Sequence, residues 1–345
     1  MDNIINKSLE ELESIILSYG ESKFRAKQIF EWLHQKGVWS YDEMTNLSKG
    51  LREKLMRDWP IPTMRIIEKY ESQMDGTIKY LFELSDSHII ESVLMRYKHG
   101  NSICISSQVG CRMGCKFCAS TIDGLARNLE VSEMLGQIYF VSQDINERIS
   151  NVVIMGSGEP LEHLEITRKF IEQINHEKGY HIGQRHLTIS TCGIVPAMKA
   201  LADEKLQVTL AISLHAGTDE KRKAIMPIAN KYTIEQLLEA CRYYIEKTGR
   251  RVTFEYALIQ GENDSKEDAM QLVKLLRGML CHVNLIPVNP VKERNYTASL
   301  KESVENFAYV LQSNHIETTV RRRLGQDIDA ACGQLRRRYL ENRGD

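Results

Sequence analysis

The chain has 345 residues, of which 42% are hydrophobic and 26% are charged. This is ordinary globular composition, and it excludes a chain that is disordered throughout. The formal net charge of -1 excludes a uniformly basic nucleic-acid binder but leaves room for a local basic face. No apolar run approaches the roughly 18 residues of a membrane-spanning helix, and the polar, acidic start of the chain lacks the pattern of a signal peptide. We therefore expect a cytoplasmic protein with no membrane partner.

The first sixty residues have the pattern of helices. Ser8 and Glu11 have the spacing of a capping box, which predicts that a helix begins there. A second apolar stripe at helical spacing runs from Phe24 to Leu33, and a shorter helix is expected over 51–59, before a proline-containing break.

The pattern then changes to a period of two, which predicts β-strands. An Asp75-Gly76 turn separates the first two of them. The expected strands are Met64–Ser72, Thr77–Leu84 and Ile89–Arg96. Four segments follow from these patterns: an accessory helical domain at 1–60, a β-hairpin adaptor at 61–97, an α/β core at 98–335 and a basic C-terminal tail at 336–345.

In the α/β core, short β-rich runs alternate with amphipathic helical stretches, which implies parallel βαβ units. The six expected strands are Ser102–Ser106, Asn151–Met155, His186–Ser190, Gln207–Ser213, Arg251–Leu258 and His282–Ile286. A further strand is expected near 318–322. Six such units predict a partial (β/α)6 barrel, with the chemistry at the carboxyl ends of its strands.

Three cysteines follow the first barrel strand with the spacing CxxxCxxC: Cys111, Cys115 and Cys118. Three thiolates hold three irons of a [4Fe–4S] cluster and leave the fourth iron open. Zinc is the rival ligand, but a closed structural zinc site needs a fourth donor. The nearest histidines, His99 and His163, have no familiar ligand spacing. The cluster is therefore the favoured interpretation.

Polar residues also follow the other predicted strands. In MGSGEP, glycines allow a ligand to approach the backbone, and Glu159 is able to accept a hydrogen bond from an ammonium group. Further candidates at or just past strand ends are Ser190, Ser213, Leu214, His215 and Asn289. The alternative for each of these residues is ordinary loop capping.

Two more cysteines are candidates for chemistry. Cys332 is flanked by small residues, which leave room for a substrate, and a helix capped by Asp327 or Asp329 would favour its thiolate. Cys104 lies in the first barrel strand. The alternative for both is a small buried hydrophobic residue, which is the interpretation kept for the remaining thiols, Cys192, Cys241 and Cys281.

The segment CRMGCKFC resembles the cluster loop of radical S-adenosylmethionine (SAM) enzymes. The longer run ISSQVGCRMGCKFCASTIDGLARNL, with MGSGEP, TISTCGIVP, SLHAGTDEKR, NLIPVNP and DIDAACGQL, resembles a narrower family. These are the radical SAM adenine-C2 methyltransferases that act on bacterial 23S rRNA and on tRNA. The match covers most of residues 85–335. It implies a radical SAM barrel with one [4Fe–4S] cluster per chain, SAM on the open iron and two SAM molecules per turnover.

The resemblance also implies roles for individual residues. Gly158 and Glu159 would bind the amino end of SAM, and the strand-end residues named above would supply the remaining contacts. Cys332 would take a methyl group from one SAM, and a 5′-deoxyadenosyl radical from a second SAM would remove a hydrogen atom from it. The resulting methylene radical would add to C2, Glu91 would accept the ring proton, and Cys104 would attack Cys332 to release methylated RNA and leave a disulfide.

The implied partners are 23S rRNA, tRNAs methylated at an adenine next to the anticodon, and an external, flavodoxin-like one-electron reductant; a monomer is expected. The N-terminal helices would help to bind RNA. Phosphate contacts are expected from the C-terminal arginines, namely Arg321, Arg322, Arg323, Arg336, Arg337, Arg338 and Arg343. The target adenine must leave its stack to reach a buried radical.

Three alternatives stay open. A sister branch methylates C8 of the same ribosomal adenine with the same pair of thiols, and a radical SAM enzyme with another substrate, such as a glycyl-radical activase, leaves Cys332 unexplained. From a different class, a non-catalytic, zinc-bearing RNA-binding protein would not need SAM. Cys192 departs from the family pattern, which has a small residue there, and would either pack or form an off-pathway disulfide.

Overall fold

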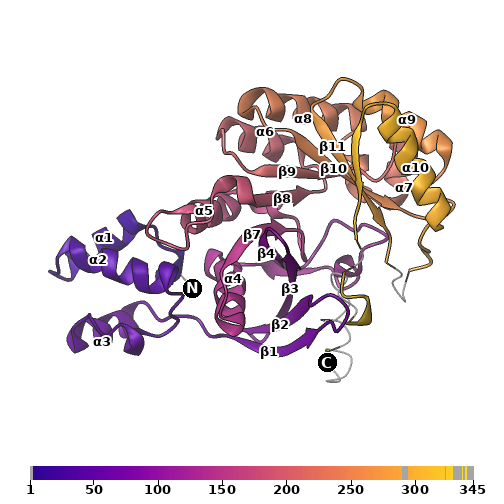
Figure 1. Cartoon of the computed structure of the whole chain (residues 1–345). Coiled ribbons are helices and arrows are strands. Elements are labelled where there is room, and N and C mark those ends of the chain that lie inside the picture. The colour runs from indigo at the N-terminus through magenta and orange to yellow at the C-terminus, as the bar shows by residue number, and fades with distance from the viewer. Residues whose placement is uncertain (1–2, 290–293, 323, 329–335, 337–338, 340–345) are drawn as a thin grey trace.

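The fold is seen in a computed structural model that describes residues 3–289, 294–322, 324–328, 336 and 339 (Figure 1). Ten strands form one sheet in the order β1-β2-β3-β4-β7-β8-β9-β10-β11-β12. Pairs from β1 to β4 are antiparallel, and every pair from β4 onward is parallel. The predicted α/β class with a partial parallel barrel is therefore confirmed.

The N-terminal helices form a layer at one end of the molecule (Figure 1). They are α1 (Leu9–Ser18), α2 (Lys23–Phe30) and α3 (Lys49–Asp58). The predicted capping box is present: the Ser8 side chain accepts the Glu11 N–H, and the Glu11 carboxylate accepts the Ser8 N–H. The prediction was wrong for Phe24, which is 60% exposed because α2 buries its other face, with Ile29 and Phe30.

The expected hairpin adaptor is a three-stranded antiparallel extension of the barrel sheet. Its strands are β1 (Met64–Glu71), β2 (Ile78–Leu84) and β3 (Ile89–Tyr97). Val93 of β3 pairs with Cys104 of β4 (Gly100–Ile105), so the extension and the barrel share one ladder of hydrogen bonds. This continuity places β3 directly beside the first barrel strand.

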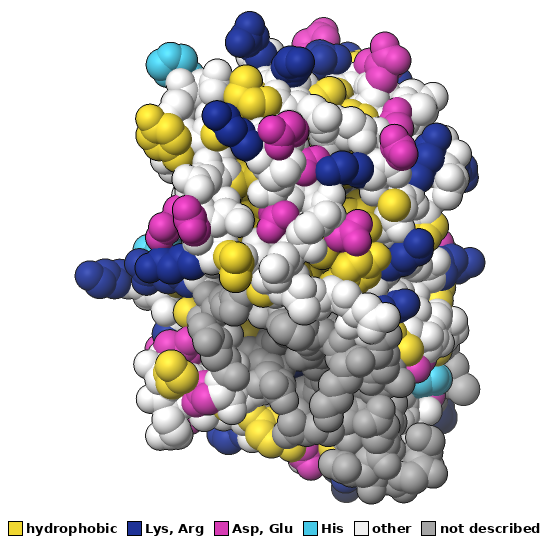
Figure 2. Space-filling model, turned by 90° about the vertical axis from the view of Figure 1, so that its right-hand side faces the viewer, with side chains coloured by type: hydrophobic (Ala, Val, Ile, Leu, Met, Phe, Trp, Pro, Cys, Tyr) yellow, Lys and Arg dark blue, Asp and Glu magenta, His cyan; other side chains and the backbone are white. Residues whose placement is uncertain are grey.

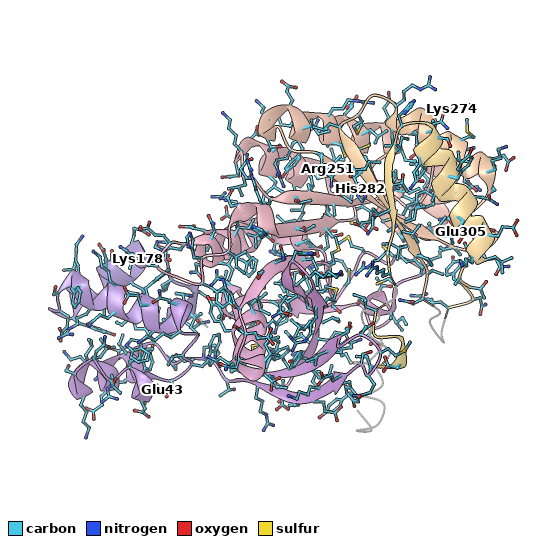
Figure 3. All side chains as sticks on the ribbon, in the orientation of Figure 1. Glu43, Lys178, Arg251, Lys274, His282 and Glu305 are labelled. Carbon is cyan, nitrogen blue, oxygen red and sulfur yellow. The ribbon has the colours of Figure 1, made fainter. Side chains whose placement is uncertain are left out.

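After β4, strands and helices alternate along the chain. The strands are β7 (Ile149–Ile154), β8 (Leu187–Thr191), β9 (Thr209–Ser213), β10 (Val252–Leu258), β11 (Cys281–Pro287) and β12 (Glu317–Val320). The helices are α4 (Val131–Ile145), α5 (Leu164–Asn175), α6 (Val195–Asp203), α7 (Asp219–Ile225), α8 (Ile234–Thr248), α9 (Lys266–Leu276) and α10 (Lys301–Ser313). Each helix buries one stripe against the sheet and exposes the other, as Lys274 of α9 and Glu305 of α10 show (Figure 3).

The two edges of the barrel sheet differ in character. Arg251 and His282 lie at the amino ends of β10 and β11 (Figure 3), where Arg251 pairs with Glu317 at 2.5 Å. The carboxyl edge holds the loops with the cysteine and glycine motifs. Over the described part of the chain, no helix combines the length and apolar character needed to cross a bilayer.

Candidate active site

A cavity of about 320 Å³ opens at the carboxyl ends of the parallel strands. Most of the residues predicted to carry chemistry line it: Cys104, Cys111, Cys115, Cys118, Gly158, Glu159, Ser190, Ser213, His215 and Asn289. Two do not line it: Leu214 is fully buried in the hydrophobic core, and Glu91 lies on β3, two residues before the lining residue Val93. Cys332 lies outside the described residues.

The cysteine loop is closed by a small ribbon. Its strands are β5 (Gln108–Gly110) and β6 (Leu125–Asn128), which pair antiparallel on either side of the loop. Inside it, the Cys111 N–H donates to the Gly124 carbonyl at 2.8 Å, and the Thr121 hydroxyl donates to the carbonyls of Cys115 and Cys118, at 3.0 Å each. Hydrogen bonds to the backbone of all three cysteines therefore hold the loop in place.

Gly110 allows the loop to close. Its φ is +76°, and a Cβ atom there would lie 2.0 Å from the Gly124 carbonyl oxygen. We expect Gly110→Ala to cost the 1–2 kcal/mol of a left-handed alanine and about 1–3 kcal/mol more from steric overlap, measured by urea unfolding. Gly124→Ala is the matched control, because Gly124 has a φ of +70° and nothing within 4 Å. Equal costs for the two variants would refute this account.

The thiols fit the ligand set of a cluster. Burial raises the pKa of Cys111 to about 12 and raises the pKa of Cys115 above its usual range. Buried thiolates therefore need positive charge beside them, which irons supply. Among the described side chains, no group of three or more His, Cys, Asp or Glu is arranged to hold a single metal ion. A cluster does not need such a group, because each cysteine of a cubane binds a different iron. The geometry fits a [4Fe–4S] cluster with an open iron.

The MGSGEP loop is packed tightly against the β4–β5 connection. A Cβ atom on Gly158 would lie 2.5 Å from the Ser107 hydroxyl, and Gly158 has a φ of +120°. Glu159, 3% exposed, follows in the cavity wall. Its carboxylate accepts the N–H groups of Cys192 at 2.7 Å and Leu161 at 3.0 Å. Burial raises the pKa of Glu159, and these two donors oppose the rise.

His215 presents a neutral ring to the cavity. It is buried, it has a φ of +57°, and its Nδ1 accepts the Ala257 N–H at 2.9 Å. Burial and the nearby Arg222 cation lower the pKa of His215 to about 3. With Nδ1 occupied as an acceptor, the proton is on Nε2, so the ring offers one hydrogen-bond donor.

Arg222, a fully buried residue that the sequence analysis missed, holds two strand-end loops together. It donates to the carbonyls of Cys192 at 2.7 Å and of Leu214 and Ser213, at 3.2 Å each. Leu214 is thus a structural link between loops, with its side chain in the core. An arginine that follows a strand end in SLHAGTDEKR is the signal available in the sequence.

Glu255 was missed as well. It is 5% exposed in the middle of β10, lines the cavity and accepts a hydrogen bond from the Asn284 side chain at 2.8 Å. Burial raises its pKa, and the charge of Arg321 opposes the rise. Arg321 and Arg322 line the same cavity. A lone carboxylate inside the apolar run VTFEYALI is the signal that identifies such a residue.

The remaining cysteines divide into two groups. Cys241 is fully buried in the hydrophobic core, and Cys281 is partly buried at the start of β11, away from the cavity. Cys192 lines the cavity and packs against Cys115, and its backbone N–H binds Glu159. Cys192 is 6% exposed, so the expectation of a packed thiol is confirmed, and its place in the cavity wall is an addition to it.

Two expectations about charged residues are corrected, and a third residue, Glu91, is a buried carboxylate at 2% exposed. Asp327 binds the Ser72 hydroxyl at 2.6 Å and the Gln73 N–H at 2.9 Å in the β1–β2 turn, so its carboxylate is not available as a helix cap. The Arg336 side chain is only 14% exposed and donates to the Ile89 carbonyl at 2.8 Å, so it is not part of a solvated basic tail.

Comparisons with known proteins agree with this site. The radical SAM superfamily model matches residues 105–273, and the model for the ribosomal RNA large subunit methyltransferase N-terminal domain matches residues 2–61. A crystal structure of a radical SAM methyltransferase from Sphaerobacter thermophilus superimposes with a TM-score of 0.93 at 41% identity, covering 97% of this chain and 99% of that one. Fold and site together define a radical SAM methyltransferase that uses a [4Fe–4S] cluster and SAM.

Curated relatives narrow the class. A protein named "probable dual-specificity RNA methyltransferase RlmN" from Clostridium botulinum (strain Alaska E43 / Type E3) is 59% identical over the full length of both chains. Its namesake from Clostridium novyi (strain NT) is 57% identical over 99% of this chain and all of its own. The chain belongs to the RlmN family.

Proposed function

We propose that this enzyme methylates C2 of a specific adenine in 23S rRNA and of the adenine next to the anticodon in tRNAs. The observation that carries the proposal is the presence of Cys104, a thiol separate from the cluster motif, in the same cavity as the three motif cysteines. The names of the full-length relatives support RNA as the substrate. We also propose a monomer that receives electrons from an external, flavodoxin-like reductant.

The electronic character of the target explains the need for two thiols. Adenine C2 is an electron-poor amidine carbon, so it does not attack the methyl group of a sulfonium. When bound, the cluster and SAM would supply a methyl group and a carbon-centred radical. The protein must therefore hold the one-carbon unit on a group of its own and later release the product from it.

The chain provides both of these functions through two cysteines. Cys332 carries the one-carbon unit as an S-methyl group and links covalently to C2 after loss of one hydrogen atom. The adduct formed in this way is a radical, so it must give up one electron, for which the oxidised iron–sulfur cluster would be the acceptor, and Glu91 accepts the C2 proton. The Cys104 thiolate attacks the sulfur of Cys332, the bond from that sulfur to carbon breaks, and its electron pair remains on the carbon, which takes up a proton. Methylated RNA leaves, and the Cys104–Cys332 disulfide is reduced by an external thiol.

SAM binding is assigned to the strand-end residues. Glu159 accepts from the ammonium group of SAM, with Gly158 leaving space for it, and Ser190, Ser213, the Leu214–His215 backbone and Asn289 complete the contacts. The described geometry supports this assignment, because the Glu159 carboxylate lies in the cavity wall and is oriented by two backbone donors.

Glu159→Gln is expected to weaken SAM binding about 10–100-fold. The substitution removes a charge-assisted hydrogen bond, worth about 1.5–3 kcal/mol, and turns an amide toward one of the backbone N–H donors. Titration of SAM into the cluster-loaded protein, followed by electron paramagnetic resonance, measures the change. Glu162→Gln is the control, because Glu162 pairs with Arg112 at 2.9 Å and is outside the cavity lining. Unchanged SAM affinity in Glu159→Gln would remove Glu159 from the binding site.

The RNA substrate is tested by methyl transfer. Reconstituted enzyme, reductant and methyl-labelled SAM are incubated anaerobically with unmodified 23S rRNA or tRNA, and label in each RNA is counted. The proposal requires label in both RNAs. No label in RNA from an enzyme with an intact cluster would overturn it. On the face shown in Figure 2, basic and acidic side chains are intermixed, so membership of the family, and not the charge of this face, supports RNA binding.

A further inference from the structure

Two charged side chains are buried side by side in the antiparallel extension of the sheet. Lys79 of β2 is fully buried and Glu91 of β3 is 2% exposed. Their Nζ and Oε2 atoms are 3.3 Å apart. Both strands are otherwise largely apolar, so this ion pair departs from the pattern of its surroundings.

The pair lies on the face of the sheet that carries Cys104. Lys79 is the cross-strand partner of Val93, and Val93 is the partner of Cys104, so the three form one row across β2, β3 and β4. Directly opposite residues in antiparallel strands share a face, and residues two apart on one strand do so as well. Glu91 therefore stands on this face too, next to the row.

The C-terminal segment covers this face. Tyr339 packs against Leu81 and Ile89. The backbone N–H of Arg336 donates to Glu91 Oε2 at 3.2 Å, so the same oxygen faces both Lys79 and Arg336. Arg336 is four residues after Cys332 in the sequence. Glu91 is thus held between a buried cation on one side and the chain that follows Cys332 on the other.

Stability alone does not account for such a pair. Removing two charges from water costs several kcal/mol per ion, and well-packed apolar residues in their place are often equally or more stable. A base that takes a proton from carbon, in contrast, must be fixed in direction before the substrate arrives. A buried ammonium 3.3 Å from one carboxylate oxygen meets this need.

We infer that Lys79 is a positioning residue for the release step: its ammonium group holds the Glu91 carboxylate in place and directs it toward the adenine that is linked to Cys332. The inference rests on the proposed function. In the step it serves, the radical adduct gives up one electron, for which the oxidised iron–sulfur cluster would be the acceptor. The C2–H bond breaks, its electron pair stays with the purine, and the proton joins Glu91, which becomes a neutral acid.

The test uses full-length, cluster-loaded enzyme and separates this step from the earlier ones. In Lys79→Met, S-methylation of Cys332, measured by mass spectrometry of the protein, is expected to be normal. Release of methylated RNA is expected to slow at least 100-fold, as loss of a general base does, and a covalent RNA–protein adduct accumulates as a shifted band on denaturing gels. Lys79→Arg restores a cation, so its release rate is expected to lie nearer the wild-type value than that of Lys79→Met.

Two further variants exclude a purely structural effect. Lys69→Met is the control, since Lys69 of β1 is a half-exposed lysine paired with Asp144 at 2.9 Å, and its enzyme is expected to release RNA at the wild-type rate. The double variant Lys79→Met/Glu91→Gln removes both charges, so neither charge is left buried without its partner. If Lys79 acts through Glu91, this double variant is no slower in release than Glu91→Gln alone.

The outcomes distinguish the inference from the proposed function. Absence of methylated adenine with the wild-type enzyme overturns the proposed function. Methylation by the wild-type enzyme together with wild-type release by Lys79→Met overturns the inference alone. So does a double variant that releases RNA more slowly than Glu91→Gln, because Lys79 would then act independently of Glu91.

Discussion

Cys111→Ala is expected to lose both the cluster and all methyl transfer. Cys111 is held inside the β5–β6 ribbon by its hydrogen bond to Gly124, so no neighbouring thiol replaces it without opening the ribbon. Two remaining cysteines leave two irons without protein ligands, and the SAM-binding iron is no longer defined. Iron and sulfide analysis, the visible absorbance of the cluster and electron paramagnetic resonance after reduction measure the loss.

A second cysteine serves as the control for this variant. Cys281 lies at the amino end of β11, away from the cavity, so Cys281→Ala is expected to keep a full cluster and wild-type methylation. A Cys111→Ala enzyme that keeps four irons and methylates RNA would contradict the assignment of the CxxxCxxC motif. Loss of the cluster in both variants would indicate a general effect of removing thiols.

Cys104→Ala is expected to stop one step before product release. The cluster loop is untouched, so Cys332 is methylated and links to the RNA. No thiol then attacks Cys332, and a stable RNA–protein adduct builds up toward one per enzyme while free methylated RNA stays below 1% of the wild-type yield, on the order of the 10²-fold or greater losses seen on removing a reacting group. Denaturing gels of labelled RNA and mass spectrometry of digested adduct measure both species.

The adduct also distinguishes Cys104 from a packing residue. Cys104 is 3% exposed, and Cys104→Ala therefore leaves a small cavity beside Val93 and Met95. A purely structural defect would lower cluster content and adduct formation together. Release of methylated RNA at the wild-type rate by Cys104→Ala would show that another group resolves the adduct.

The sequence predicted the barrel because its signals are local. The alternation of β-rich runs with amphipathic stretches follows from the periodicity of the apolar residues, and the observed strand ends differ from the expected ones by at most two residues. The cluster loop was equally accessible, because three ligands within eight residues are a short-range pattern. The loops that follow the strands meet at one edge for topological reasons, so Glu159, Ser190 and His215 could be expected there.

Residues that act through burial could not be predicted in this way. Lys79 and Glu91 are twelve positions apart, and only the pairing of β2 with β3 brings their charges together. Arg222 and Glu255 each carry a local signal, but their contacts depend on which loops and strands become neighbours. For Asp327, a plausible local role as a helix cap is replaced by a contact with a turn more than 250 residues away.

The central claim is that the methyl group reaches C2 by way of a thiol and a carbon radical, and one isotope measurement tests it most directly. Unmodified 23S rRNA is incubated anaerobically with the reconstituted enzyme, reductant and SAM bearing a trideuterated methyl group, and its nucleosides are analysed by mass spectrometry. The account predicts 2-methyladenosine with two deuterium atoms in the new methyl group, because one is removed before the carbon bond forms. A product that retains three deuterium atoms would contradict the thiol-bound radical route, and 8-methyladenosine would contradict the assignment to C2.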